Sequence, residues 1–214
     1  MPYLRAGLDV DGCDISADMI AACRERAARE GLSPTLFVQP MHELDPPRTY
    51  RTVFICGGFG IGSTRAQDEE ALRRIHQCLE PGGTLVLDKE VPYSGPKHWR
   101  HWCKSARREL PEPWPEDGST KQAADGSELT LRVRLVAIDP LDQTVTIEMR
   151  AEQRRDGRAV AEEQYALTER MYFMHELVLM LERAGFSDVA VYGGHEGARP
   201  TAEHDFLAYV ATRS

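Results

Sequence analysis

The sequence predicts an α/β fold, with a mostly parallel sheet, a C-terminal antiparallel pair of strands and an antiparallel β insertion. Three observations support this prediction. Short apolar runs alternate with amphipathic helices over residues 8–88, apolar and polar residues alternate over 129–149, and two apolar strands end the chain. Continuous apolar runs are typical of buried parallel strands, whereas alternation is typical of half-buried antiparallel strands. We expect one domain over residues 1–214, with the insertion at residues 92–168.

The first half of the chain is predicted to contain parallel β–α–β units. Residues 8–14 form a buried strand that ends in Asp14, and Ser16 caps a helix that Gly31 stops. Short connections between strands and helices favour right-handed parallel crossovers. The other predicted segments are strands at 35–38, 52–56 and 84–88, a glycine-rich loop at 57–62 and a helix at 68–80.

The second half changes character near Pro92. Residues 95–110 are predicted as a helix, and three antiparallel strands follow, separated by turns at 139–142 and 156–157. An apolar helix at 172–184 precedes two strands that we expect to pair antiparallel at a sheet edge, at residues 189–192 and 205–211. Helical spacing places three methionines in the core: Met171, Met174 and Met180.

Composition and charge argue against several classes of protein. The net charge of −8 disfavours nucleic acid as a partner, because phosphate binding needs clustered Lys and Arg. The apolar runs are too short to span a membrane, and the first residues lack the apolar core of a signal peptide. We expect no disulfide and no zinc site. The five cysteines are predicted to be reduced, mostly buried thiols of a cytoplasmic protein: Cys13, Cys23, Cys56, Cys78 and Cys103.

Three motifs, at residues 12–16 (GCDIS), 79–85 (LEPGGTL) and 181–186 (LERAGF), occur in an order and at spacings that carry a family resemblance. Together they resemble the class I S-adenosylmethionine-dependent methyltransferases of the small-molecule type, over nearly the whole chain. The resemblance implies a Rossmann-like sheet, S-adenosyl-L-methionine as cofactor and methyl transfer to a small-molecule acceptor. The acceptor and its reacting atom stay open. The insertion at 92–168 would be the lid and the acceptor-specificity element.

The resemblance also implies roles for residues at the ends of the first two strands. Asp14 matches the acid that accepts hydrogen bonds from the ribose hydroxyls, and its two oxygens suit two adjacent donors. Ile15 would pack on the adenine face. An alternative role for Asp14 is to cap the helix beside Ser16. Where the family often has an acid that reads the adenine amine, this chain has Met41, so Gln39 or backbone groups would take that part.

Cys56 and Gly57 match the end of the next strand, where small residues let the backbone approach the methionine part of the cofactor. We assign no catalytic residue from sequence. His42, His98 and His175 are candidate general bases, because imidazole titrates near neutral pH. His98 and His101 are spaced as a chelating pair, but no third ligand is near in sequence, so we expect two exposed lid histidines and no metal.

The first residues of the chain create a mechanical problem. Residues 1–7 match only the end of the helix that follows the central first strand of the resembled fold, so that strand and its glycine-rich turn are missing. The facing edges of 9–13 and 53–56 would then lose buried hydrogen bonds, each costing about 1–3 kcal/mol. The chain would be a fragment or a mis-started reading (the explanation we favour), a fold in which another segment fills the gap, or a degenerate protein. We expect it to bind S-adenosylmethionine poorly.

Two other functions compete with methyl transfer. A nicotinamide-dependent oxidoreductase would share the acid at the strand end, but the Pro-Gly-Gly at residues 81–83 and the terminal antiparallel pair disfavour it. A non-catalytic binding or assembly module would use exposed sheet edges to recruit a partner or to form a homodimer.

Overall fold

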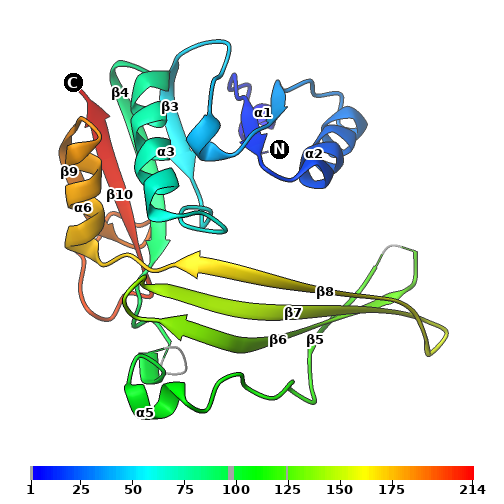
Figure 1. Ribbon diagram of the computed structural model, residues 1–214. Helices are drawn as coiled ribbons and strands as arrows, with labels where there is room; N and C mark the ends of the chain where they lie inside the picture. The colour runs from blue at the N-terminus through cyan, green and yellow to red at the C-terminus, as the bar shows by residue number, and fades with distance from the viewer. Residues whose placement is uncertain (1, 96–98, 124) are drawn as a thin grey trace.

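The strands of this computed structural model form three sheets over the residues that the structure describes, 2–95, 99–123 and 125–214 (Figure 1). A small parallel sheet contains β1 (Gly12–Asp14) and β2 (Leu36–Val38). The central sheet has the order β3-β4-β10-β9, with bounds Tyr50–Ile55, Leu79–Glu90, Phe206–Arg213 and Phe186–Gly193. The insertion sheet has the order β5-β6-β7-β8, with bounds Ser119–Gln122, Glu128–Asp139, Thr144–Arg155 and Arg158–Arg170.

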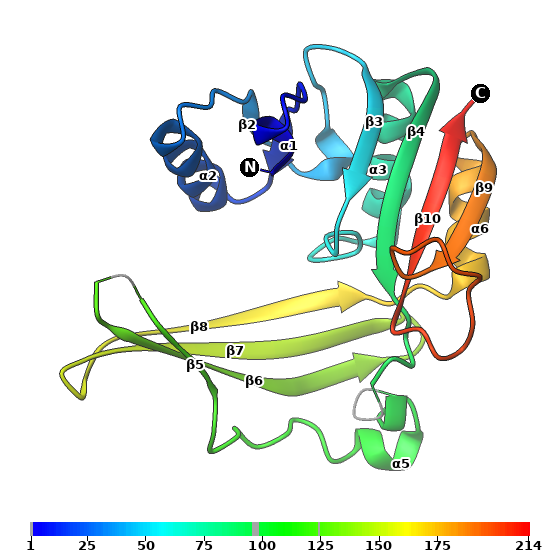
Figure 2. The same cartoon turned by 180° about the vertical axis from the view of Figure 1, so that it is seen from behind.

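The central sheet mixes strand directions. β3 and β4 are parallel, with Val53 opposite Leu85, and β10 is antiparallel to both β4 and β9. The last two strands therefore pair antiparallel, and β9 lies at the edge as expected. Helices α3 (Arg65–Cys78) and α6 (Met174–Arg183) both cover one face of this sheet (Figures 1 and 2).

Both helices begin at residues other than those predicted, α3 because of a local cap and α6 beside a contact between residues distant in sequence. α3 begins before residue 68 because Thr64 and Gln67 form a capping box, in which each side chain binds the other's backbone N–H. α6 begins after Tyr172, whose hydroxyl donates a hydrogen bond to Asp68 at 2.6 Å and holds that residue outside the helix.

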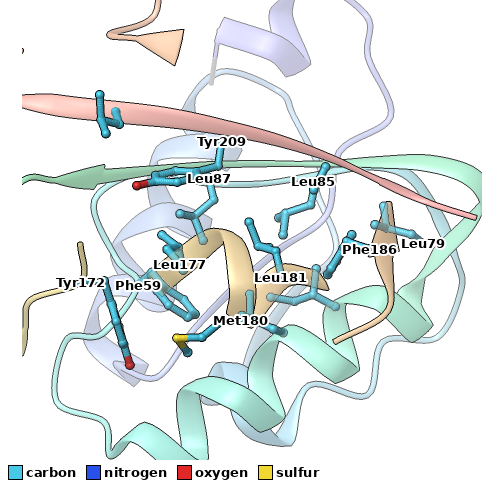
Figure 3. Packing of buried hydrophobic residues seen from close by; sticks show 14 of the residues in the cluster. Phe59, Leu79, Leu85, Leu87, Tyr172, Leu177, Met180, Leu181, Phe186 and Tyr209 are labelled. Atoms are coloured by element: carbon cyan, nitrogen blue, oxygen red, sulfur yellow. The ribbon is translucent and has the colours of Figure 1, made fainter. Parts of the chain in front are cut away.

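The main core lies between the central sheet and these two helices (Figure 3). Leu177 and Leu181 from α6 pack against Leu85, Leu87 and other apolar side chains of the sheet, and all four are fully buried. Burying one such side chain contributes about 1.5–3 kcal/mol. The core prediction for the methionines is confirmed, with two of them buried and the third packed against the cluster: Met171, Met180 and Met174.

The N-terminal unit contains α1 (Pro2–Arg5), β1, α2 (Ala17–Arg29) and β2. Ser16 caps α2 as predicted, since its hydroxyl accepts the N–H of Met19 at 3.2 Å. The opening strand is shorter than the predicted 8–14 and is not buried: Leu8 is 55% exposed and Cys13 is exposed. β1 pairs with β2 alone among the described strands, so its other side stays open.

The insertion has four strands, not the predicted three, and β8 runs past residue 168 to Arg170. Its sheet lies across the end of the central sheet toward which the arrowheads of β3 and β4 point (Figures 1 and 2). The helix predicted at 95–110 is interrupted: residues 101–103 are a turn or bend before α5 (Lys104–Arg107), and residues 96–98 lie outside the described residues. Trp99 and Trp102 both pack on Phe173, a tertiary contact that a continuous helical pattern does not predict.

All five cysteines are free, but the prediction that most are buried is wrong. Cys13, Cys56 and Cys103 are exposed, and only Cys78 is buried. The strands that carry Cys13 and Cys56 border an open cavity, which explains their exposure. No helix in the described part of the chain is long and apolar enough to cross a membrane.

Candidate functional site

A cavity of about 1190 Å³ separates the N-terminal unit from the central sheet. Residues 8–13 line one side, residues 50–56 line the other, and Asp88 and His195 also contribute to the wall. Its volume suits a ligand of cofactor size. A smaller cavity of about 300 Å³, between residues 44–49 and the end of α3, contains none of the predicted site residues.

The cavity lies where two strand edges are unpaired. Among the described strands, β1 pairs only with β2 and β3 only with β4, so their inner edges border the cavity from opposite sides. We expected buried, orphaned hydrogen-bonding groups here. That expectation is wrong, because Cys13, Thr52 and Phe54 are exposed and their edges are open to water.

Side chains bridge the two sides of the cavity at a few points. The Tyr3 ring packs on Phe54 with centroids 5.3 Å apart, and the Tyr50 hydroxyl donates to Asp11 Oδ2 at 2.9 Å. Burial, aided by the nearby Asp11 carboxylate, raises the pKa of Tyr50 to about 12, so this phenol stays a donor at neutral pH. Arg48 forms ion pairs with both Asp11 and Asp9, and its hydrogen bonds lower the pKa of Asp9.

The predicted residues Asp14 and Gln39 lie side by side at the carboxyl ends of β1 and β2. The Gln39 N–H donates to the Asp14 carbonyl oxygen at 3.0 Å. Asp14 Oδ1 accepts the N–H of Ser16, the N-cap residue of α2, at 2.8 Å, while Oδ2 makes no hydrogen bond within the described residues. Ile15 is 71% exposed. Met41 begins the short 3-10 helix η1 (Met41–Glu43), which packs beside α3.

Cys56 and Gly57 form a second group, at the carboxyl end of β3. Cys56 lines the cavity; Asp14, Ile15, Gln39, Met41 and Gly57 do not. The N–H of Gly57 donates to Asp88 Oδ1. Burial and the negative charge of Asp88 raise the pKa of the Cys56 thiol, so this cysteine stays protonated at neutral pH.

Asp88 and His195 are cavity residues that sequence reasoning missed. Asp88 Oδ2 lies 2.9 Å from His195 Nε2. Asp88 follows an apolar run just as Asp14 follows its own strand, so a search for acids at strand ends would have found it. His195 lies 107 residues from Asp88 in sequence, and nothing in the sequence indicates that the two residues meet.

The other histidines are placed away from this pair. His42 Nε2 lies 3.0 Å from the amide nitrogen of Gln67, and His175 is exposed on α6. Neither residue lines the large cavity, so these two candidate bases are not placed to take a proton from a ligand bound there. His101 is 3% exposed, so the expectation of an exposed lid histidine is wrong for this residue. The turn at 101–103 replaces the surface helix that we predicted there, while His98 lies outside the described residues. Across residues 2–95, 99–123 and 125–214, no cluster of three or more potential metal ligands is present.

The glycine-rich loop at 57–62 is fixed to the insertion on its other side. The Arg170 N–H donates to the Gly60 carbonyl at 2.8 Å, and the Gly62 N–H donates to Thr168 at 2.8 Å. The buried Lys89 ammonium donates to the Phe59 carbonyl at 3.0 Å and pairs with Glu169. The loop therefore joins the central sheet to the insertion.

Residues 2–83 match a family model described as a methyltransferase domain. Among solved structures, an S-adenosylmethionine-dependent methyltransferase from Clostridium acetobutylicum matches with a TM-score of 0.70 and 12% identity, over 94% of this chain and 73% of that chain. The methyltransferase CcbJ from Streptomyces caelestis matches with a TM-score of 0.69 and 22% identity, over 98% of this chain and 76% of that chain. CalS10, an amino pentose methyltransferase from Micromonospora echinaspora, matches with a TM-score of 0.60 and 20% identity, over 96% of this chain and 74% of that chain.

No curated protein matches the sequence significantly. Residues 2–83 carry the methyltransferase-domain pattern, and the chain as a whole has the fold of class I S-adenosylmethionine-dependent methyltransferases.

Proposed function

We propose that this chain transfers a methyl group from S-adenosyl-L-methionine to a small-molecule acceptor. The observation that carries the proposal is the cavity of about 1190 Å³, bordered at the carboxyl ends of β3 and β4 by Cys56 and Asp88. Ligands of open α/β sheets bind outside the carboxyl ends of the strands. The structure of CalS10 contains the same cofactor, and KedS8 is a sugar N-methyltransferase, which supports a small-molecule acceptor.

The residues at the carboxyl ends fit the adenosine part of the cofactor. Asp14 keeps Oδ2 without a hydrogen bond among the described residues, so it can accept from a ribose hydroxyl. The exposed Ile15 side chain offers an apolar surface for adenine, and Gln39 lies beside Asp14. When bound, S-adenosylmethionine supplies a methyl group already activated on a sulfonium. The chain then has to align the acceptor and exclude water.

The insertion suits the role of lid. Its sheet lies across the end of the central sheet that carries Cys56 and Asp88 (Figure 1). Trp114 packs within the insertion on the guanidinium groups of Arg134 and Arg150, which lie 4.6 and 4.5 Å from its ring centroid. We propose that residues 92–168 select the acceptor.

We further propose that these 214 residues bind the cofactor weakly. The amino-acid part of S-adenosylmethionine needs backbone donors, and the N–H of Gly57 is already used by Asp88. Calorimetry should give a dissociation constant of roughly 1 mM, about −4 kcal/mol. Nanomolar binding would contradict this part of the proposal.

The function is tested by supplying S-adenosylmethionine at millimolar concentration with a panel of small amines and hydroxyl compounds, amino sugars included. Release of S-adenosylhomocysteine that depends on both the acceptor and the folded chain supports methyl transfer. If none of these compounds is methylated while the cofactor binds, the catalytic proposal fails. The same assay decides whether oxygen, nitrogen or carbon is methylated.

A second candidate is a non-catalytic binding or assembly module. It is favoured by the unpaired edges of β1 and β3, since open edges recruit further strands. Light scattering after size exclusion separates the two: a stable dimer that ignores the cofactor favours the module, and a monomer that binds it favours the enzyme. We also propose a cytoplasmic location, because all five cysteines are free, and no nucleic-acid partner, given the net charge of −8.

A further inference from the structure

We propose that His195 is the general base of this methyl transfer and that Asp88 is its positioning residue. The inference rests on the proposed function and adds a residue that takes the acceptor's proton. Both side chains line the large cavity at the carboxyl end of the central sheet. They come from different parts of the fold: Asp88 from β4, and His195 from the connection between β9 and β10.

Asp88 is held so that one of its oxygens is presented to the imidazole. Its Oδ1 accepts the N–H of Gly57, and its Oδ2 lies 2.9 Å from His195 Nε2. The Asp88 side chain is 14% exposed, whereas that of His195 is 62% exposed. The acid is therefore fixed against the sheet, and the imidazole is accessible to a ligand.

The carboxylate also decides which nitrogen of His195 carries the proton. A carboxylate oxygen accepts hydrogen bonds, so His195 Nε2 donates to Asp88 and Nδ1 keeps its lone pair. Among the described residues, Nδ1 has no hydrogen-bond partner. An imidazole that is oriented by a carboxylate at one nitrogen and free at the other has the arrangement of a general base.

The backbone around His195 restricts where the imidazole can lie. Gly194 and Gly197 have φ of +72° and +73°, and the N–H of Gly193 donates to the Ala198 carbonyl at 2.9 Å, closing a tight turn. The Phe206 ring lies against the imidazole, with centroids 4.7 Å apart. The turn, the ring and Asp88 together hold the base in one place.

The reaction releases a proton from the acceptor, and we assign the removal of this proton to His195 and Asp88. An amine or hydroxyl acceptor forms its new bond to the methyl carbon with a lone pair, while the electrons of the methyl–sulfur bond go to sulfur. The acceptor must then lose its proton. His195 Nδ1 takes it, and the Asp88 carboxylate stabilises the imidazolium that forms. The imidazolium returns the proton to water after the product leaves.

The test compares His195→Asn with a matched control, His175→Asn, at an exposed histidine that does not line the cavity. General-base catalysis contributes about 10²–10⁴-fold, so His195→Asn should lower kcat by at least about 100-fold. Cofactor binding and thermal unfolding should stay as in the wild-type chain. His175→Asn should keep the wild-type kcat.

Two further readouts separate catalysis from a structural role. Added imidazole should restore part of the activity of His195→Ala, because it can replace a missing base but not a missing packing contact. Nitrogen NMR of the wild-type chain should show His195 with its proton on Nε2, and Asp88→Asn should change that pattern. A proton on Nδ1 in the wild-type chain would overturn the assignment.

Failure of the proposed methyl transfer and failure of the role of His195 give different experimental results. A wild-type chain that binds the cofactor but methylates no acceptor contradicts the proposed function. An active chain in which His195→Asn keeps the wild-type kcat contradicts the role of His195 alone. Loss of activity in His195→Asn together with loss of cofactor binding, or without imidazole rescue of His195→Ala, also overturns the assignment of a base.

Discussion

The loop after β3 and the free edge of β3 lie in very different surroundings: the loop is hydrogen-bonded to the insertion, and the edge faces an open cavity. The loop, residues 57–62, enters a junction with the insertion in which charged groups are buried and paired. The edge borders the open cavity, across which the N-terminal unit is held by the exposed Arg48–Asp9 ion pair, by contacts of Arg48 and Tyr50 with the largely buried Asp11, and by one aromatic contact. Burial strengthens electrostatic contacts and makes unpaired groups costly, whereas water screens the exposed pairs. We therefore expect the junction to be rigid and the N-terminal unit to be the part that opens.

The largest expected effect concerns Asp68, at the centre of the junction. It is 1% exposed and accepts hydrogen bonds from Tyr172 and Ser63, with Arg170 3.9 Å away. Asp68→Ala leaves the buried Tyr172 hydroxyl without its acceptor and removes the carboxylate that faces the buried Arg170 guanidinium, so it should lower the free energy of unfolding by about 3–5 kcal/mol. Urea unfolding measures this. Asp117→Ala, at an exposed position outside any helix or strand, should change it by at most about 0.5 kcal/mol.

A smaller loss is expected at Gly60, in the same junction. Its φ is +82°, and an added Cβ would lie 3.0 Å from the Arg170 carbonyl oxygen. Gly60→Ala should therefore lower the free energy of unfolding by about 1–3 kcal/mol. Gly7 has a similar φ of +77° with nothing within 4 Å, so Gly7→Ala isolates the backbone strain. Equal losses at both positions would contradict the close approach of loop and insertion.

In the N-terminal unit, replacing Asp14 should weaken cofactor binding more than it lowers the free energy of unfolding. Loss of one charge-assisted hydrogen bond to the ribose should weaken cofactor binding of Asp14→Asn about tenfold, or about 1.4 kcal/mol. Saturation-transfer NMR detects binding in this weak range. Asp18→Asn removes the same charge in the first turn of α2, away from the strand end. This control variant should bind the cofactor as the wild-type chain does.

The smallest effect should come from Arg48, which ties the N-terminal unit to the rest. Its hydrogen bond lowers the pKa of Asp9, so this contact contributes at neutral pH and is lost as the pH falls through the lowered pKa. Hydrogen exchange, corrected for intrinsic rates, should show β1 and β2 losing protection at acid pH while β4 and β10 keep theirs. Arg48→Gln should give that faster exchange already at neutral pH. Equal protection of both regions would contradict the comparison.

Most of the fold was predictable because its signals are local. The apolar run before Asp88, the cap at Ser16 and the methionine spacing of α6 each act within a few residues, and the structure confirms the elements that they predict. The predictions for Cys13 and His101 were wrong because burial depends on which segment covers a residue, and that segment is distant in sequence.

The sequence by itself determined the alternation of strands and helices, the antiparallel insertion and the family resemblance, since each follows from residue types at short spacing. The tertiary structure alone decided how the site is arranged. It placed Asp88 against His195 across 107 residues of chain, and it left the edges of β1 and β3 open on either side of a cavity. Both outcomes depend on the docking of whole elements, whose free energy is summed over many distant contacts that no local pattern records.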